Sequence, residues 1–168
     1  TAERATVRIE RISPPVIAPV GDKTVKAGSL LAFTITGSDP DGPTTLEFRV
    51  EPLLPGAHFV PLGDVSMDGE LNIADSLFIA QYLVGSRVLD YKQLAVGDIS
   101  ENGQIGIEDA MFISQSLVGS RPPFNKYRFV WQPTAEQIGV QTVGFVVSDG
   151  RLSAQEKISI TVTANDSP

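Results

Sequence analysis

The chain contains one short unit written twice, and this duplication decides how the rest of the sequence is interpreted. Residues 63–75 read GDVSMDGELNIAD, and residues 97–109 read GDISENGQIGIED. The similarity continues through LFIAQ at 77–81 and MFISQ at 111–115, and LVGSR is identical at 83–87 and 117–121. Each copy begins with turn-forming residues and ends with helical spacing, as expected of a repeated supersecondary unit.

Each copy begins with the residue pattern of a calcium-binding loop. Oxygen-bearing side chains occupy positions 1, 3 and 5, glycine occupies position 6, and a carboxylate occupies position 12. Ca²⁺ takes about six to eight oxygen ligands at about 2.3–2.6 Å, so the chain must wind tightly around it. Gly69 and Gly103 permit this sharp turn, because they have no Cβ.

The predicted ligands come from both loops. In the first they are Asp64, Ser66, Asp68, the carbonyl of Glu70, Asn72 directly or through water, and Asp75. In the second they are Asp98, Ser100, Asn102, the carbonyl of Gln104, a water near Gly106, and Asp109. The alternative is a surface turn rich in Asp, Asn and Gly. Two copies in one register, each leading into an apolar helix, argue against that alternative.

The two loops are not expected to bind equally. The first offers three ligand carboxylates and the second offers two. We therefore expect two Ca²⁺ ions, the first bound more tightly. Both loops carry Asp where an ordinary EF-hand loop has a bidentate Glu at position 12, and the sequence indicates a helix after each loop but none before it.

With these departures, the segment from Leu62 to about Pro122 resembles a dockerin, the Ca²⁺-binding module that docks onto cohesins in cellulosome-like assemblies. The resemblance implies a cohesin-like partner and recognition at loop positions 10 and 11 and one or two helical turns beyond. These positions are Ile73, Ala74, Ala80 and Gln81 in the first copy, and Ile107, Glu108, Ser114 and Gln115 in the second. Dockerins often carry small hydroxyl residues at positions 10 and 11, so Ile-Ala and Ile-Glu imply a more apolar interface. The difference between Ala74 and Glu108 implies one preferred binding orientation.

Both helices have two apolar stripes on a 100° helical wheel. The inner stripe contains Phe78, Ile79, Tyr82 and Leu83, with Phe112, Ile113 and Leu117 in the second copy. The outer stripe contains Ile73, Leu77, Ala80, Gln81 and Val84, with Ile107, Met111, Ser114, Gln115 and Val118. A unit of about 60 residues can bury one stripe with the help of bound Ca²⁺, which leaves the outer stripe for a partner. The alternative is that the outer stripe packs on the rest of the chain.

The segments on either side of the repeat have the composition of β-strands. Strands are expected near residues 16–17, 22–28, 30–36, 45–50, 57–60, 127–131, 141–148 and 154–162. Neither flank suffices alone, but together they give about seven strands in about 105 residues, the size of an immunoglobulin-like sandwich. They also resemble cadherin-like repeats of bacterial and archaeal surface proteins, through SDPDG at 38–42, FVWQPT at 129–134 and VSDG at 147–150.

The expected fold is mainly β with an α insert. Residues 1–61 and 124–168 form a discontinuous, seven-stranded Ig-like β-sandwich, and residues 62–123 form an inserted, EF-hand-like unit of two loop-helix repeats. A hairpin turn can accept a domain whose ends lie close together. We expect the insert to stand at one pole of the sandwich.

Composition excludes several functions. The chain has 168 residues, 42% apolar content, no cysteine and a net charge of -7. We expect no nucleic-acid partner, because a basic surface is absent, and no membrane span, because no apolar run is long enough. No signal-peptide pattern begins at Thr1, so we expect a mature fragment or a piece of a longer protein. Asp at position 12 suits an extracellular or cell-surface location, where Ca²⁺ is abundant.

The expected function is a non-catalytic, Ca²⁺-dependent protein-protein interaction module. The sequence shows no paired carboxylates of a cleft, no phosphate-binding glycine loop and no zinc-ligand spacing, so we expect no enzyme. A parent protein could bring the module to cell-surface polysaccharide. One alternative is a structural spacer or adhesin repeat with a Ca²⁺-stiffened insert. Another is a carbohydrate-binding sandwich, which requires Trp131 and Tyr127 to be exposed together.

Overall fold

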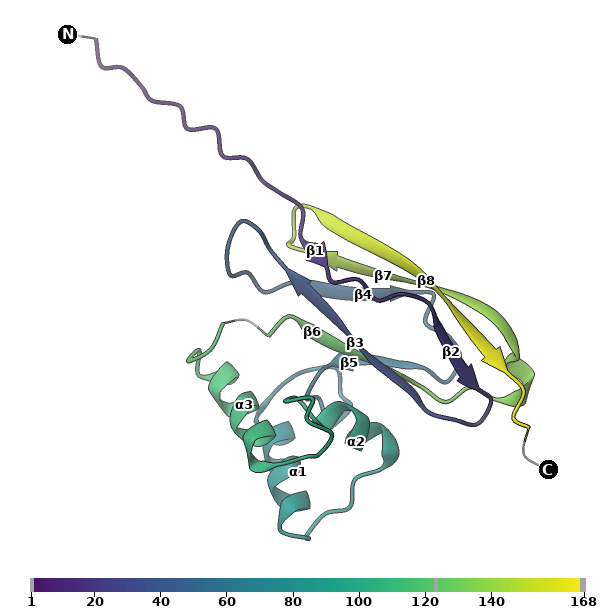
Figure 1. Cartoon of the computed structure of the whole chain (residues 1–168). Helices are drawn as coiled ribbons and strands as arrows, with labels where there is room; N and C mark the ends of the chain where they lie inside the picture. The colour runs from purple at the N-terminus through teal and green to yellow at the C-terminus, as the bar shows by residue number, and fades with distance from the viewer. Residues whose placement is uncertain (1, 123, 167–168) are drawn as a thin grey trace.

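In the described residues, two four-stranded sheets pack face to face and three α-helices lie against one of them (Figure 1). The computed structural model describes residues 2–122 and 124–166. The protein is mainly β. Within the described residues there are eight strands, one in or near each of the eight ranges where a strand was expected, so the expected total of about seven was one too low.

The sheets interleave the two halves of the sequence. The strands are β1 Val16–Ile17, β2 Lys23–Lys26, β3 Leu31–Ser38, β4 Glu47–Glu51, β5 His58–Pro61, β6 Lys126–Trp131, β7 Gly139–Ser148 and β8 Ser153–Thr163. One sheet has the order β1-β3-β6-β5 and the other β2-β8-β7-β4. The β2–β8 pair is parallel, whereas the other pairs are antiparallel. Because β6 pairs with both β3 and β5, neither flank of the repeat forms its sheet alone.

Strand β6 shows how the sheet acquires two buried faces. Phe129 and Trp131 lie in the core between the sheets, and the Trp131 indole N–H donates to the carbonyl of Pro55 at 3.1 Å. Val130 points the other way, because successive side chains of a strand alternate, and it joins a second apolar cluster. Trp131 is 1% exposed, so it cannot form a sugar-stacking surface with Tyr127.

All three helices lie between β5 and β6 in the sequence. They are α1 Ile73–Leu83, α2 Tyr91–Gly97 and α3 Ile107–Leu117. Pro61 at the end of β5 is opposite Tyr127 in β6, and the N–H of Leu62 donates to the carbonyl of Lys126 at 3.0 Å. The helical segment therefore leaves and rejoins the sandwich at neighbouring positions.

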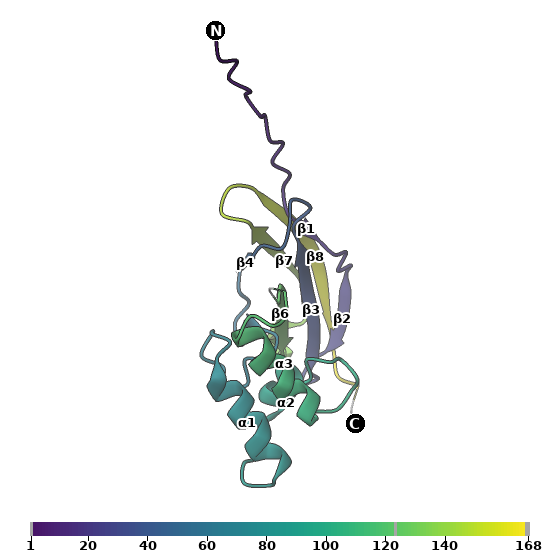
Figure 2. The same ribbon diagram turned by 90° about the vertical axis from the view of Figure 1, so that its left-hand side faces the viewer.

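The helices lie beside β3 and β6 in both views, against the outer face of their sheet (Figures 1 and 2). The expectation that they stand at a pole of the sandwich is therefore wrong. The reason is the apolar outer face of the sheet, where Ala32, Val60 and Val130 join one cluster with buried residues such as Val96 and Ile99. When the helices cover this face, its apolar surface is removed from water. An insert attached at the pole of the sandwich would leave that surface exposed.

Helix α2 was missed by sequence reasoning, which expected no helix before either loop. Asp90 caps it, because the Asp90 carboxylate accepts hydrogen bonds from the N–H groups of Lys92 and Gln93, both at 2.9 Å. The Gln93 side chain accepts from the Asp90 N–H in return. This Asp-x-x-Gln capping box was visible in the sequence, but the helix has only seven residues.

Candidate metal-binding loops and the adjoining helix surface

The first loop is wound around two buried carboxylates. Asp64 and Asp75, at positions 1 and 12, are both fully buried. The Asp64 carboxylate accepts from the N–H groups of Asp68 at 3.2 Å and Gly69 at 2.8 Å. The Asp75 carboxylate accepts from the N–H groups of Ser66 and Asn72, both at 2.8 Å. These bonds tie the two ends of the loop together.

The second loop repeats this pattern position by position. The Asp98 carboxylate accepts from the N–H groups of Asn102 at 3.1 Å and Gly103 at 2.7 Å. The Asp109 carboxylate accepts from the N–H groups of Ser100 and Gly106, both at 2.8 Å. The hydrogen bonds of the duplicated unit are therefore duplicated as well as its sequence.

The backbone of both loops turns left-handed at the same two positions. Met67 and Glu101, at position 4, have φ values of 61° and 55°. Gly69 and Gly103, at position 6, both have φ of 91°, a conformation that other residues adopt only with strain. The backbone thus already has the tight winding that a bound cation requires.

The donor chemistry fits Ca²⁺, although the side chains do not converge fully. Burial raises the pKa of Asp64, and the negative charge of Asp75 raises it further. The hydrogen bonds from Gly69 and Ser66 lower this pKa but do not outweigh burial. A cation would offset this repulsion. In the described part of the chain, no three acidic, His or Cys side chains gather closely enough to hold a metal. In the first loop, the Asp68 carboxylate instead accepts from Glu70 N–H at 2.9 Å and would have to turn inward.

The remaining predicted ligands differ between the loops at position 9. The Asn72 side chain caps α1 by accepting from Ala74 N–H at 2.8 Å. Gly106 gives α3 no side-chain cap. At position 7, Glu70 and Gln104 are exposed, and the Gln104 N–H donates to the position-5 side chain at 2.9 Å.

Glu108 fills the space that Gly106 leaves empty. Its carboxylate accepts from the Asn102 side-chain amide at 2.9 Å, beside a predicted ligand. A Cβ added to Gly106 would collide with this carboxylate. Glu108 was predicted to contact a partner, but here its side chain folds back over its own loop. The pairing of Gly at position 9 with Glu at position 11 is the sequence signal that could have indicated this.

The outer stripe faces solvent, away from the sandwich. Leu77 is 53% exposed and Met111 is 52% exposed. The other large apolar members are also exposed: Ile73, Val84, Ile107 and Val118. The smaller members are half-buried: Ala80, Gln81, Ser114 and Gln115. Ala74, which was also predicted to contact a partner, is half-buried as well.

A shallow groove of about 310 Å³ runs between α1 and α3 along the outer stripe. Its floor contains Ser76, whose hydroxyl donates to the carbonyl of Ala110 at 3.0 Å and lies 3.0 Å from the Ser114 hydroxyl. Ala80 and Met111 line its walls. The groove therefore combines apolar walls with two hydroxyl groups.

The inner stripe is only partly buried. Ile79 and Ile113 are 0% and 1% exposed, so they pack in the core as expected. Leu83 and Leu117 were assigned to the same stripe, but they are 40% and 44% exposed because the last turn of each helix projects beyond the core. This part of the assignment is wrong.

An arginine in each copy stacks on a phenylalanine, which the sequence did not predict. The Arg87 guanidinium lies 3.6 Å from the ring centre of Phe78, and its Nε–H donates to the Gln81 side chain at 2.8 Å. Arg121 lies 3.9 Å from Phe112 in the second copy. The Gly-Ser-Arg that ends each copy therefore returns to its own helix.

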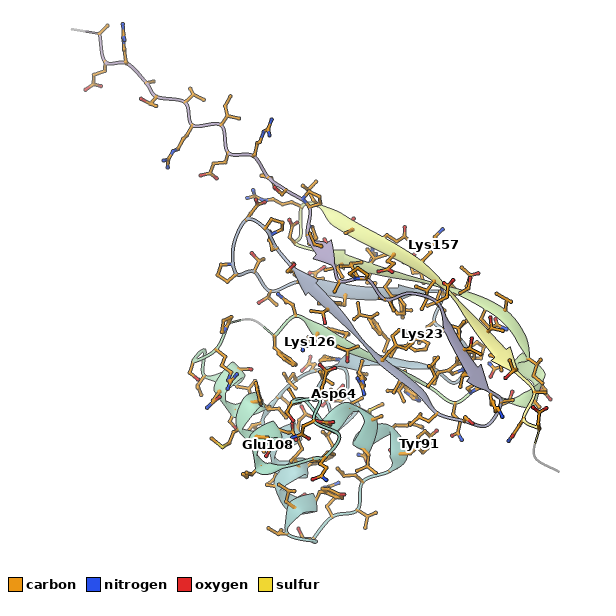
Figure 3. All side chains as sticks on the ribbon, in the orientation of Figure 1. Lys23, Asp64, Tyr91, Glu108, Lys126 and Lys157 are labelled. Atoms are coloured by element: carbon orange, nitrogen blue, oxygen red, sulfur yellow. The ribbon has the colours of Figure 1, made fainter. Side chains whose placement is uncertain are left out.

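The second loop also contacts the sandwich through Glu101. Its carboxylate accepts from the Thr34 hydroxyl at 2.8 Å and lies 3.2 Å from the Lys126 ammonium. The Arg128 guanidinium lies 3.6 Å away and donates through Nε to the carbonyl of Ala95 at 2.9 Å. Lys126 at the start of β6 is labelled in Figure 3. The first loop has Met67 at the equivalent position, packed against the apolar cluster instead.

No family model and no curated protein matches the chain. Among solved structures, the SrpA adhesin from Streptococcus sanguinis has a TM-score of 0.47 and 10% identity, over 94% of this chain and 60% of that chain. An endo-fucoidan hydrolase of glycoside hydrolase family 107 has a TM-score of 0.45 and 13% identity, over 90% and 14%. Titin domain M7 has a TM-score of 0.41 and 9% identity, over 92% and 99%. The chain thus spans about one seventh of the length of this fucoidan hydrolase.

Within the described residues, no helix is both long and apolar enough to cross a membrane.

Proposed function

We propose that the protein is a non-catalytic, Ca²⁺-dependent interaction module. Residues 62–123 act as a dockerin-like insert in an Ig-like host formed by residues 1–61 and 124–168, and the insert docks onto a cohesin-like receptor outside the cell or on its surface. Two Ca²⁺ ions hold the loops, and the loops fix α1 and α3. The outer stripe is the docking surface.

The observation that carries this proposal is the exposure of the outer stripe in both copies. Helix α1 and the residue that follows it expose Ile73, Leu77 and Val84, which leaves apolar surface in water at a free-energy cost. The second copy does the same with Ile107, Met111 and Val118. Several large apolar side chains exposed along one stripe are typical of a protein-protein interface. The sandwich is not its partner, because it contacts the opposite side of the unit.

The loops explain how Ca²⁺ would control such a surface. Asp75 and Asp109 are the position-12 ligands and also lie in the first turns of α1 and α3. A cation held at position 12 would therefore fix the start of each helix and the groove between them. Calcium binding and formation of the docking surface would be one equilibrium.

The test is a calorimetric titration of the chain against a panel of cohesins, in Ca²⁺ and in excess chelator. Binding in Ca²⁺ that disappears with chelator supports the proposal, whereas binding that ignores chelator contradicts it. Met111→Asp should weaken binding at least tenfold. Leu53→Asp is the matched control, because Leu53 is 51% exposed but lies in the sandwich. Equal effects of the two changes would exclude the outer stripe as the docking surface.

A structural spacer is the second candidate, and one observation favours it. The contacts of Glu101 with Thr34, Lys126 and Arg128 join the insert to the sandwich, as a stiffened surface repeat would need. In that case Ca²⁺ would raise the melting temperature, but no cohesin would bind. The titration separates the two functions.

A further inference from the structure

The N-terminal segment, residues 3–12, is extended and projects away from both sheets in the two views (Figures 1 and 2). Val7 is 82% exposed and Ile9 is 88% exposed. At the end of the segment, Ser13 N–H donates to the Asp41 carboxylate at 2.6 Å, where the chain joins the sandwich. An extended segment with alternating, exposed apolar residues lacks the sheet that would bury them.

The sequence of this segment matches a strand of the same protein. Residues 3–10 read ERATVRIE, and residues 156–163 of β8 read EKISITVT. In this register the three apolar residues of the segment coincide with three buried core positions of β8: Ala5 with Ile158, Val7 with Ile160, and Ile9 with Val162. The segment therefore has the inward-facing pattern of β8.

The polar residues of the segment fit the same register. The four that alternate with the apolar ones coincide with polar positions of β8 that are exposed or half-buried: Arg4 with Lys157, Thr6 with Ser159, Arg8 with Thr161, and Glu10 with Thr163. A shift of one residue would place Thr6, Arg8 and Glu10 in the core, because strand side chains alternate with a period of two.

Glu3 coincides in this register with a residue of β8 that makes a hydrogen bond outside its own strand. It coincides with Glu156, whose carboxylate accepts from the N–H of Val20 at 3.0 Å. This hydrogen bond attaches the loop between β1 and β2 to strand β8. A carboxylate at position 3 could serve a second sandwich in the same way.

We propose that residues 3–10 are the last strand of another sandwich of this topology, which stands ahead of this one in a row. There the segment occupies the β8 place, parallel to a β2 strand and antiparallel to a β7 strand. Residues 11–15 then join the two sandwiches over at most about 17 Å, stiffened by Pro14 and Pro15. The N-terminal segment and the C-terminal end of β8 leave the sandwich at opposite poles, as a row requires (Figure 1). This arrangement of sandwiches requires neither Ca²⁺ binding nor docking.

The register is tested by exchanging strands within the full chain. Residues 156–163 are replaced with residues 3–10 in one variant and with residues 4–11 in the control, which has nearly the same composition but is shifted by one. Trp131 fluorescence reports the sandwich, because this tryptophan is 1% exposed in its core. The first variant should unfold cooperatively, about 5–15 °C below the parent, mainly because Ala replaces Ile158. The control should not fold. Equal behaviour of both variants would overturn the proposal.

The connection is tested by fusing residues 14–155 directly to residues 3–166, so that one segment must complete the first sandwich while remaining attached to the second. Both Trp131 residues should become buried, and amides 4–10 should be protected from hydrogen exchange. In the unmodified chain the same amides should exchange at least a hundredfold faster. A fusion in which the first copy keeps its own β8 controls for folding of tandem copies. If that control folds while the first sandwich of the test fusion stays unfolded, the segment is not a last strand.

Discussion

The two copies of the duplicated unit share a backbone and a hydrogen-bond pattern, yet they meet different surroundings. Asp64 and Asp98 accept from equivalent backbone N–H groups, and position 4 is left-handed in both copies. The copies differ in what occupies that position, since Met67 packs in the apolar cluster whereas Glu101 reaches across to the sandwich. The loop pattern therefore fixes the backbone, while the residues between the predicted ligands decide how each copy connects to the rest of the molecule.

The largest expected effect comes from removing a position-12 carboxylate in one copy. Asp75→Ala leaves the N–H groups of Ser66 and Asn72 without their acceptor, which should cost about 2 kcal/mol of stability without metal. It should also abolish binding in the first loop. Calorimetry should show the Ca²⁺ stoichiometry fall from about two to about one. Asp109→Ala is the matched change in the second copy, and retention of both ions in either variant would contradict the ligand assignment.

The next largest effect is expected at position 11, where Glu108 in the second copy should strengthen Ca²⁺ binding and Ala74 in the first copy should not. Glu108→Gln removes the carboxylate that lies beside Asn102, and we expect the second loop to bind Ca²⁺ about tenfold more weakly, a loss of about 1.4 kcal/mol. Ala74→Gln is the control in the first copy and should leave its Ca²⁺ affinity within about twofold. Titration with terbium, followed by luminescence, measures both loops. An unchanged second site would show that Glu108 adds nothing to metal binding and would leave it available to a partner.

The Glu108 carboxylate also reduces the expected difference in Ca²⁺ affinity between the two loops. Counting carboxylates among the predicted ligands gave three in the first loop and two in the second. Glu108 supplies a third near the second loop, so the difference in affinity should be smaller than the ligand count alone predicts.

A smaller effect is expected at the start of α1. Asn72→Ala removes the side-chain cap on Ala74 N–H and should lower the free energy of unfolding by about 1 kcal/mol. The second copy already lacks this cap at Gly106. Urea unfolding followed by far-ultraviolet circular dichroism measures the change. The control is Ala74→Ser, a change two residues further along the chain. An equal loss of stability in both variants would show that the cap has no special role.

The sequence was sufficient to predict the mainly β architecture, and particular residues show why. The alternation of Phe129, Val130 and Trp131 is visible without coordinates, because a strand with a period of two must present different faces to its neighbours. The alternation alone did not reveal that Val130 faces a second apolar core and not water. That depends on where the helical unit lies, and the position is set by contacts between residues far apart in the sequence.

The candidate site shows the same division. The loop spacing could be read directly, since glycine and oxygen-bearing residues at fixed positions reflect local geometry. Contacts such as Glu101 with Thr34, or Glu108 with Asn102, depend on side-chain directions that a linear pattern does not contain. Helix α2 was missed for a different reason, because seven residues are too few for a periodic signal.

The smallest expected effect tests the bridge between the second copy and the sandwich. Glu101→Gln removes the charge that faces Lys126 and Arg128, but Glu101 is about two-fifths exposed, so solvent screens the pair. The loss of stability should therefore be at most about 1 kcal/mol. The informative measurement is the rise in the Trp131 melting temperature on adding Ca²⁺, because Trp131 lies in the sandwich and not in the loops.

If Glu101 couples the second loop to the sandwich, the Glu101→Gln variant should lose part of this Ca²⁺-dependent rise. The control is Glu70→Gln, which removes an exposed charge from the first loop without touching the sandwich. Equal rises in parent and both variants would mean that Ca²⁺ stabilises the sandwich through the shared apolar cluster instead. The packing of Val60 and Val130 against the helical unit, and not the ion pairs, would then join the two parts of the molecule.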